Sequence, residues 1–223
     1  TGVFQHTVDF DPGADTTEFT SAGARDLFVS KLDSSGDLVW ARSFGGTGTD
    51  MAWSVAVDSS GNVYTTGDFN GSATSFEIEF LGVTNNLPAS AAPGTVFVSK
   101  LNSSGEYVWA TNFGGTGDSG GGGVGYSVAV DSSGNVYTTG RFRSNAHFNN
   151  VADSPSIYLS SAGNDDVFVS KLDSSGDTVW AKRLGTGPYY SDRGYSVAVD
   201  SSGNVYTTGR FNNMTDFDPD PSE

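Results

Sequence analysis

The sequence has 223 residues and a formal net charge of -15 at pH 7, from 26 acidic and 11 basic side chains. A surface of this charge repels phosphate backbones and anionic lipid headgroups, so nucleic acid and membrane insertion are not expected, whereas divalent cations suit it. Cysteine is absent, which excludes disulfides, thiolate metal sites and cysteine nucleophiles.

The first predicted elements are an acidic flank at 7–15 and a hairpin at 26–43. The hairpin consists of two apolar runs, 27–32 and 38–43, joined by an Asp-Ser-Ser-Gly turn. A glycine at the end of such a turn takes the left-handed conformation that only glycine adopts at low cost. The aspartate of each such turn is expected to accept hydrogen bonds from backbone amides two residues further on. These aspartates are Asp33, Asp58, Asp131, Asp173 and Asp200.

Two blocks then repeat along the chain. The string Ser-Val-Ala-Val-Asp-Ser-Ser-Gly-Asn-Val-Tyr-Thr-Thr-Gly occurs without substitution at 54–67, 127–140 and 196–209. The block Phe-Val-Ser-Lys-Leu, which leads to a Trp-Ala pair, recurs in step at 28–32, 97–101 and 168–172. Gly61, Gly134 and Gly203 lie 73 and 69 residues apart, which predicts a tandem array of units of about 70 residues. Each unit contains two hairpins, and hence four antiparallel strands.

These units predict an all-β fold of the β-propeller class. The apolar runs are continuous rather than alternating, which suits sheets covered on both faces, and four-stranded sheets packed face to face form propeller blades. The fourteen-residue string has the smallest side chains and is placed innermost, and the Trp-Ala strand is placed outermost with its tryptophan over the seam between blades. The expected order is an outer hairpin 26–43, a blade 54–110, a blade 127–182 and an inner hairpin 196–211, with acidic flanks at 7–15 and 215–223.

The repeated residues resemble the SBBP-type bacterial β-propeller repeat, and more distantly NHL-like propellers. The pattern comprises the Phe-Val-Ser-Lys-Leu block, Val-Trp-Ala, Phe-Gly-Gly-Thr-Gly and the fourteen-residue string, and it covers about residues 26–211. The resemblance implies a propeller of large exported or surface proteins of bacteria, and it transfers no catalytic residues. The third copy departs from the pattern at 184–187, and the second contains extra glycines at 120–123.

The repeat is out of phase with the chain, so half-blades are expected at both ends. The segments 7–12 and 215–219 resemble each other, which places the two ends at equivalent positions. Because unpaired strand edges associate readily, two chains are expected to complete each other, as a dimeric six-bladed ring or as a fibre. The alternative is that further repeats of a longer parent chain complete them. The start at Thr1 rather than methionine indicates a processed form or an excerpt.

Two acidic clusters are candidate calcium sites. Calcium takes six to eight hard oxygen ligands and tolerates irregular geometry, which closely spaced carboxylates in a loop can satisfy. The alternative is a solvated acidic turn, and neither cluster has the spacing of an EF-hand loop. The clusters consist of Asp9, Asp11 and Asp15, and of Asp216, Asp218 and Asp220.

A second candidate site is formed by aromatic residues that precede each innermost strand, together with acids three residues earlier in two of the copies. The residues are Asp50, Trp53, Tyr126, Asp192 and Tyr195. Aromatic rings at a channel mouth could stack on a ligand, and the alternative is that they pack within the loop.

The sequence therefore predicts a non-enzymatic extracellular or cell-surface module that self-associates and is stabilised by calcium, or alternatively a lectin-like adhesive propeller that binds surface glycans. A hydrolase or lyase is disfavoured because most polar residues recur in register.

Overall fold

The structure, a computed structural model, describes residues 1–70, 76–80, 83–87, 94–115, 122–148, 157–185, 190–212 and 217. Every regular element in these ranges is a β-strand, and the strands pair antiparallel within their sheets. A helix long and apolar enough to cross a membrane does not occur among the described residues. The all-β prediction is therefore confirmed.

The sheets follow the predicted hairpins. The first sheet has the order β1-β4-β5 and comprises Gly2–Phe4, Asp26–Leu32 and Leu38–Phe44. The second contains, in order, β6 (Thr49–Val57), β7 (Val63–Asn70), β10 (Thr95–Leu101) and β11 (Tyr107–Gly115). The third contains β12 (Gly123–Val130), β13 (Val136–Phe142), β16 (Asp166–Leu172) and β17 (Thr178–Leu184). The last described sheet pairs β18 (Arg193–Val199) with β19 (Val205–Arg210).

Three further hairpins were not predicted, and one of them changes the size of a sheet. These hairpins are β2–β3 (Thr7–Asp9, Glu18–Thr20), β8–β9 (Phe76–Phe80, Val83–Leu87) and β14–β15 (Asn145–His147, Tyr158–Ser160). Strand β14 pairs with β11 through Gly114 and Gly115, which extends the second sheet to six strands. The prediction of four-stranded sheets was wrong here, because the outer edge of β11 is available for pairing and the connection within the next unit occupies it.

The first sheet also differs from the prediction, which left the inner half of this unit missing. Strand β1 pairs with β4 through Gly2↔Phe28, Val3↔Leu27 and Phe4↔Asp26. The third sheet pairs Gly140, Arg141 and Phe142 with the equivalent residues of β16. Strand β1 therefore corresponds to the end of an inner strand and supplies three residues of it.

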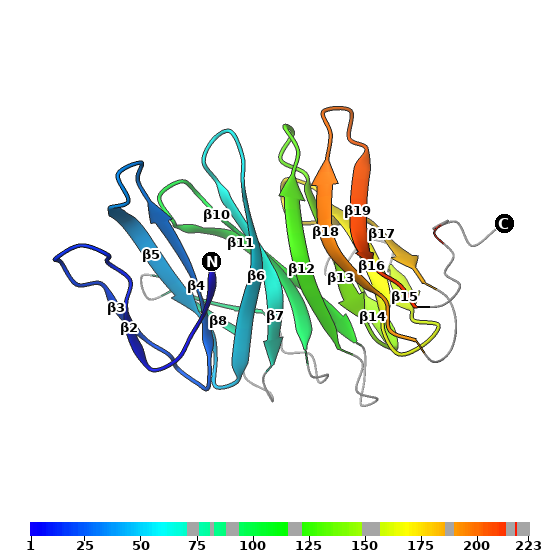
Figure 1. The fold of residues 1–223 in the computed structure, drawn as a ribbon, viewed down its shortest axis with the longest axis horizontal. Coiled ribbons are helices and arrows are strands. Elements are labelled where there is room, and N and C mark those ends of the chain that lie inside the picture. The colour runs from blue at the N-terminus through cyan, green and yellow to red at the C-terminus, as the bar shows by residue number, and fades with distance from the viewer. Residues whose placement is uncertain are drawn as a thin grey trace.

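The sheets pack face to face through two hydrophobic clusters. The first cluster lies between the first and second sheets and includes Leu27, Val29, Trp40, Phe44, Val63, Phe97 and Leu101. The second lies between the second and third sheets and includes Val96, Val98, Phe113, Val128, Phe142 and Phe168. Strands β10 and β16 are buried at six of their seven residues, as expected for sheets covered on both faces. Figure 1 shows the sheets following one another across the molecule in chain order.

The seams between sheets are covered by tryptophans, as predicted. Trp40 Nε1 donates to the carbonyl of Ser103 at 3.2 Å, and Trp109 Nε1 donates to the carbonyl of Ser174 at 3.1 Å. Each ring lies against the glycine of the next unit's turn, where a Cβ atom would come within 2.7 Å at Gly105 and 2.9 Å at Gly176. These glycines also have φ of +75° and +91°, so only glycine fits the turn in both space and conformation.

The turn aspartates accept backbone hydrogen bonds, which confirms that prediction. Asp58 Oδ1 accepts from the amides of Ser60 and Asn62 at 2.9 Å each, and its Oδ2 accepts from Asn62 Nδ2 at 2.8 Å and from the hydroxyl of Tyr64 at 3.0 Å. The same four bonds recur at Asp131 and Asp200. Each inner hairpin is thus closed by one carboxylate.

Phe10 and Phe217, one from each predicted flank, make equivalent contacts in the array. An edge-to-face phenylalanine pair recurs with interplanar angles of 86–87°, in Phe4–Phe10, Phe142–Phe148 and Phe211–Phe217. The sequence similarity between the segments at 7–12 and 215–219 therefore corresponds to a shared packing contact.

Candidate functional site

Three aromatic side chains form a row along the innermost strands, the aromatic row: Trp53, Tyr126 and Tyr195. The ring centroids of Trp53 and Tyr126 are 5.8 Å apart, and those of Tyr126 and Tyr195 are also 5.8 Å apart. Trp53 is 49% exposed and Tyr195 is 46% exposed. The sequence predicted these residues individually, and the structure brings them together as one accessible surface that crosses three successive sheets.

The row exists because each aromatic residue lies at a β-bulge. The sequence placed the aromatics in a loop before the innermost strand, but β6, β12 and β18 begin at least two residues before them. The pairing register shifts at Trp53 in β6, at Tyr126 in β12 and at Tyr195 in β18. A bulge inserts one unpaired residue and redirects its side chain, so the ring is exposed beside otherwise packed neighbours.

The serines after the first two bulges connect neighbouring sheets. Ser54 Oγ accepts a hydrogen bond from the amide of Val128 at 3.2 Å, and Ser127 Oγ accepts one from the amide of Val197 at 3.1 Å. Because the same bond recurs at successive seams, the spacing of the aromatic row is set by the packing of the sheets.

Polar side chains next to the row were missed by the sequence analysis. Trp53 Nε1 donates to Asp68 Oδ1 at 2.7 Å, and Arg141 Nε donates to the hydroxyl of Tyr126 at 3.3 Å. Asp68, Arg141 and Arg210 hold the same repeat position, directly after the invariant fourteen-residue string. This is the first position after the invariant string at which the repeats differ, and it lies on the strand paired with the bulge. The sequence therefore contained a signal that could have identified these side chains.

Asp68 has an unusual electrostatic environment. It is 3% exposed, and burial raises its pKa to about 6, although the hydrogen bond from Trp53 and the positive charge of Arg141 act in the opposite direction. Ionised carboxylates are disfavoured in apolar surroundings, so this group titrates near neutral pH. The row therefore combines exposed rings with an acid that changes charge and with a permanently charged guanidinium.

The predicted acids Asp50 and Asp192 are not part of this exposed surface. They are 3% and 1% exposed and lie in the seams. Asp50 Oδ2 accepts from the amide of Gly46 at 2.7 Å, and Asp192 Oδ1 accepts from the amide of Asn212 at 2.9 Å. Burial raises the pKa of Asp50 to about 6. Both residues hold loops at the junction of two units.

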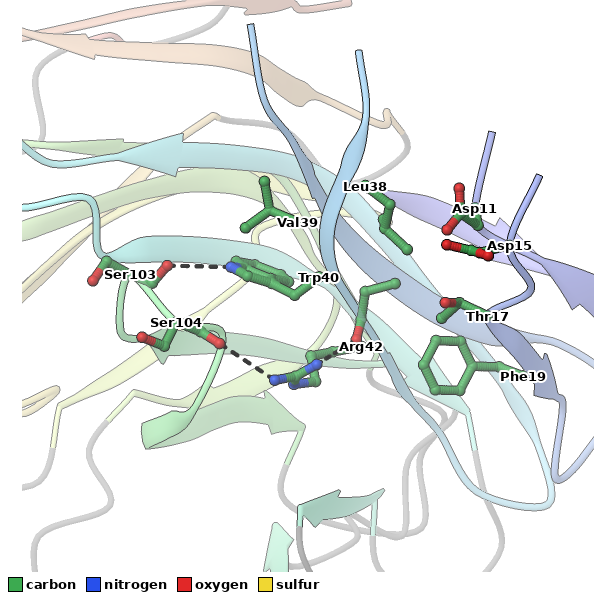
Figure 2. Close-up of a pocket in the computed structure, with 11 residues that line it drawn as sticks. Asp11, Asp15, Thr17, Phe19, Leu38, Val39, Trp40, Arg42, Ser103 and Ser104 are labelled. Carbon is green, nitrogen blue, oxygen red and sulfur yellow. Dashed lines mark hydrogen bonds between the residues drawn. The ribbon is translucent and has the colours of Figure 1, made fainter. Parts of the chain in front are cut away.

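A groove of about 720 Å³ lies between the β2–β3 hairpin and β5 (Figure 2). Asp11, Asp15 and Phe19 line it from the hairpin, and Trp40 and Arg42 line it from β5. Figure 2 shows the tryptophan and the arginine reaching the turn of the next unit, and the arginine Nε donates to the carbonyl of Gly105 at 2.9 Å. The groove is thus bounded by two consecutive units.

The acidic flank at this groove is organised by its own backbone. Asp9 Oδ1 accepts from the amides of Asp11 at 3.0 Å and Thr17 at 2.9 Å, which lowers its pKa, and Asp11 Oδ1 accepts from the amide of Gly13 at 2.7 Å. A grouping of three or more acidic or histidine side chains suited to a metal is not found in the described part of the chain. The second cluster, Asp216, Asp218 and Asp220, lies outside the described residues. Calcium binding by either flank stays a prediction.

Comparison with known proteins supports the propeller assignment. The chain is 28% identical over 202 residues to an uncharacterized WD repeat-containing protein of Acanthamoeba polyphaga mimivirus. The aligned region covers 87% of this chain and 14% of the viral protein. The chain thus spans a small part of that relative's length. A family model described as SBBP, a β-propeller repeat, matches residues 39–72 and 179–218. The resemblance to the SBBP-type β-propeller repeat is therefore confirmed at two regions of the chain.

Proposed function

We propose that this chain is a non-enzymatic, extracellular or cell-surface interaction module of the β-propeller type, which associates by completing its end sheets between chains. The resemblance to SBBP repeats supports the class and the location. The observation that carries the proposal is the exposure, at the two ends of the array, of residues that are buried in every internal unit. Further repeats of a longer parent chain would supply the same contacts within one chain.

Identical residues differ sharply in exposure along the array. Tyr206 is 58% exposed, whereas its equivalents Tyr64 and Tyr137 are 0% and 1% exposed. Leu32 at the other end is 48% exposed, whereas its equivalents Leu101 and Leu172 are 1% and 0% exposed. Exposed apolar side chains at an unpaired strand edge favour association.

The tryptophan–turn contact is also left incomplete at both ends. Trp40 lies over the Gly105 turn and Trp109 over the Gly176 turn, but nothing lies within 4 Å of a Cβ atom placed on Gly36. Trp180 is the equivalent tryptophan at the far end of the array, and among the described residues no turn of a further outer hairpin follows it. Trp180 of one chain and the Gly36 turn of the next are therefore complementary surfaces.

Strand pairing predicts how the two chains would meet. In the third sheet Val136, Tyr137 and Thr138 pair with Leu172, Lys171 and Ser170. The corresponding pairs between chains are Val205, Tyr206 and Thr207 with Leu32, Lys31 and Ser30 of the neighbour. Strand β1 stops short of this stretch of β4, because it pairs only with Asp26, Leu27 and Phe28. The first residues of β19 therefore meet an open part of the neighbour's β4, whereas Gly209 and Arg210 would compete with β1 for Phe28 and Leu27.

Light scattering coupled to size exclusion tests this proposal over a range of protein concentrations. We expect species of twice the 23.2 kDa chain mass for a closed ring, or a growing series for a fibre. The variant Trp180→Ala should shift the equilibrium toward the single chain by about tenfold or more, because it removes a buried aromatic contact. Trp53→Ala, which removes an exposed ring away from the ends, is the matched control and should leave it unchanged. A compact single chain at every concentration would contradict association between chains.

The aromatic row favours a second candidate function, the binding of surface glycans. Aromatic faces beside a carboxylate and a guanidinium suit an amphipathic sugar, which offers both C–H surfaces and hydroxyl groups. A glycan array is expected to identify binding sugars. Titration of the chain with these sugars should quench the fluorescence of Trp53, and Tyr126→Ala should lose the binding. An array without hits would count against this function and would leave the association proposal unaffected.

A further inference from the structure

Two carboxylates meet in the seam between the first and second sheets. Asp26 opens β4, Asp50 lies near the start of β6, and the amide of Asp50 donates to the carbonyl of Arg25 at 2.9 Å. Asp26 Oδ1 lies 2.6 Å from the position that a Cβ atom on Gly45 would occupy, and Asp50 Oδ2 accepts from the next amide, that of Gly46, at 2.7 Å. Asp26 and Asp50 are 4% and 3% exposed.

The same pair recurs two units later as Asp166 and Asp192, each 1% exposed. Asp166 Oδ1 and Asp192 Oδ2 lie 3.0 Å and 2.9 Å from one point, the Cβ position of Gly185. In the middle unit the equivalent positions hold Thr95 and Gly123, so both acids are absent together. Their joint presence or absence indicates that the two carboxylates act as a pair.

Each pair contains an oxygen that the protein does not satisfy. Asp26 Oδ1 and Asp192 Oδ2 are buried and have no hydrogen-bond partner. Burial raises the pKa of Asp26, and that of Asp166 is raised by burial with the nearby charge of Asp192 adding to it. Two like charges removed from water are strongly unfavourable unless a positive charge compensates them.

The two pairs differ in their compensation. Arg183 Nε lies 3.8 Å from Asp166 Oδ2. Ser43 holds the equivalent place in the first sheet, since it pairs with Phe28 as Arg183 pairs with Phe168. Among the described residues no lysine or arginine forms an ion pair with Asp26 or Asp50.

We propose that the Asp26–Asp50 pair binds a divalent cation of the calcium class, which ties the first sheet to the second. The donors are oxygens only, which are the ligands that calcium prefers, and its variable coordination tolerates additional backbone or water oxygens. At the third unit, Arg183 supplies part of the positive charge that the cation would supply at the first. The site is separate from the Asp9, Asp11 and Asp15 flank, and it does not rest on the proposed association.

Thermal unfolding followed by circular dichroism tests the site, with the whole chain in chelator, in millimolar calcium chloride and in the same concentration of magnesium chloride. We expect calcium to raise Tm by about 5–10 °C at a hundredfold excess over Kd, and magnesium to raise it less. Asp26→Asn should abolish this shift, and Asn retains an oxygen that can accept from the amide of Ala22, as Asp26 Oδ2 does. Isothermal titration calorimetry should show that Asp26→Asn loses the heat of calcium binding at this site.

Two variants make the outcome specific. Ser43→Arg copies the third unit and should replace the cation, so it should remain folded in chelator while responding little to calcium. Asp37→Asn, an exposed residue in the turn between β4 and β5, is the matched control and should keep the full shift. The proposal is overturned if calcium leaves the wild-type Tm unchanged, or if Asp26→Asn retains the full shift.

Discussion

At the residue scale, the environment of each aspartate decides its chemistry. Asp58, Asp131 and Asp200 have identical sequence neighbours, and hydrogen bonds to their carboxylates lower the pKa of all three. For the first two, burial acts in the opposite direction and is outweighed. Asp68 receives one strong hydrogen bond and is more deeply buried, so its pKa is raised instead. The balance between burial and the hydrogen bonds that a carboxylate accepts therefore determines the sign of its shift.

The raised pKa of Asp68 predicts a pH dependence. Its folded pKa of about 6 exceeds the ordinary 3.8, so the folded chain takes up a proton at higher pH than the unfolded chain does. The free energy of unfolding should therefore rise as pH falls from about 6 to about 4, by ~2 kcal/mol from this group. Trp53 donates to this carboxylate, and its fluorescence, taken as the difference from Trp53→Phe, should titrate near pH 6.

Asp68→Asn provides the control for this titration, because the amide retains a hydrogen-bond acceptor for Trp53 and loses the titratable group. The fluorescence change should vanish in this variant. A transition centred near pH 4 in the wild type would contradict the assignment.

At the element scale, an aspartate closes every described hairpin turn of the Asp-Ser-Ser-Gly type, with Asn102 in its place in the second outer hairpin, but the inner and outer hairpins use this residue differently. Asp131 accepts four hydrogen bonds, including one from Tyr137, which is 1% exposed. Asp173 in the outer hairpin accepts two, from the amides of Ser175 and Asp177. The inner hairpin is therefore anchored to the buried layer, whereas the outer turn is closed only locally.

Replacing these two acids should separate the two roles. Asp131→Ala leaves the buried tyrosine hydroxyl and the turn amides without their acceptor, and should lower the free energy of unfolding by about 3 kcal/mol. Asp173→Ala should lower it by about 1 kcal/mol, since the freed amides are exposed to water. Urea denaturation with an unchanged m-value measures both. Equal losses would show that the link to the buried tyrosine contributes nothing.

At the scale of the whole molecule, the array gains its stability at seams, where each unit covers its neighbour. A unit at the end of the array has one covered and one open face, as the contrast between Tyr137 and Tyr206 illustrates. The net charge of -15 opposes the association of two such ends. The proposed association should therefore strengthen as salt rises, because salt screens repulsion between chains and leaves apolar contacts intact.

Much of the fold followed from the sequence because the repeat is local and strict. The hairpins, the glycines of their turns, the capping aspartates and the seam tryptophans depend on residues within one unit or on its identical neighbour. The additional hairpins and strand β1 did not follow, because pairing such as that between Gly114 and His147 joins segments that carry no repeated signal. The aromatic row was anticipated one residue at a time, whereas its continuity was not.

The sequence by itself determined a tandem all-β array, its phase and the residues that repeat, since hydrophobic pattern and turn chemistry act over short distances along the chain. Tertiary structure alone decided which repeated residues share a surface. It exposed Trp53, Tyr126 and Tyr195 through bulges, and it buried Asp26 with Asp50 in a seam. The physical reason is that burial and electrostatic pairing depend on the distance between units, which is set by the packing of whole sheets.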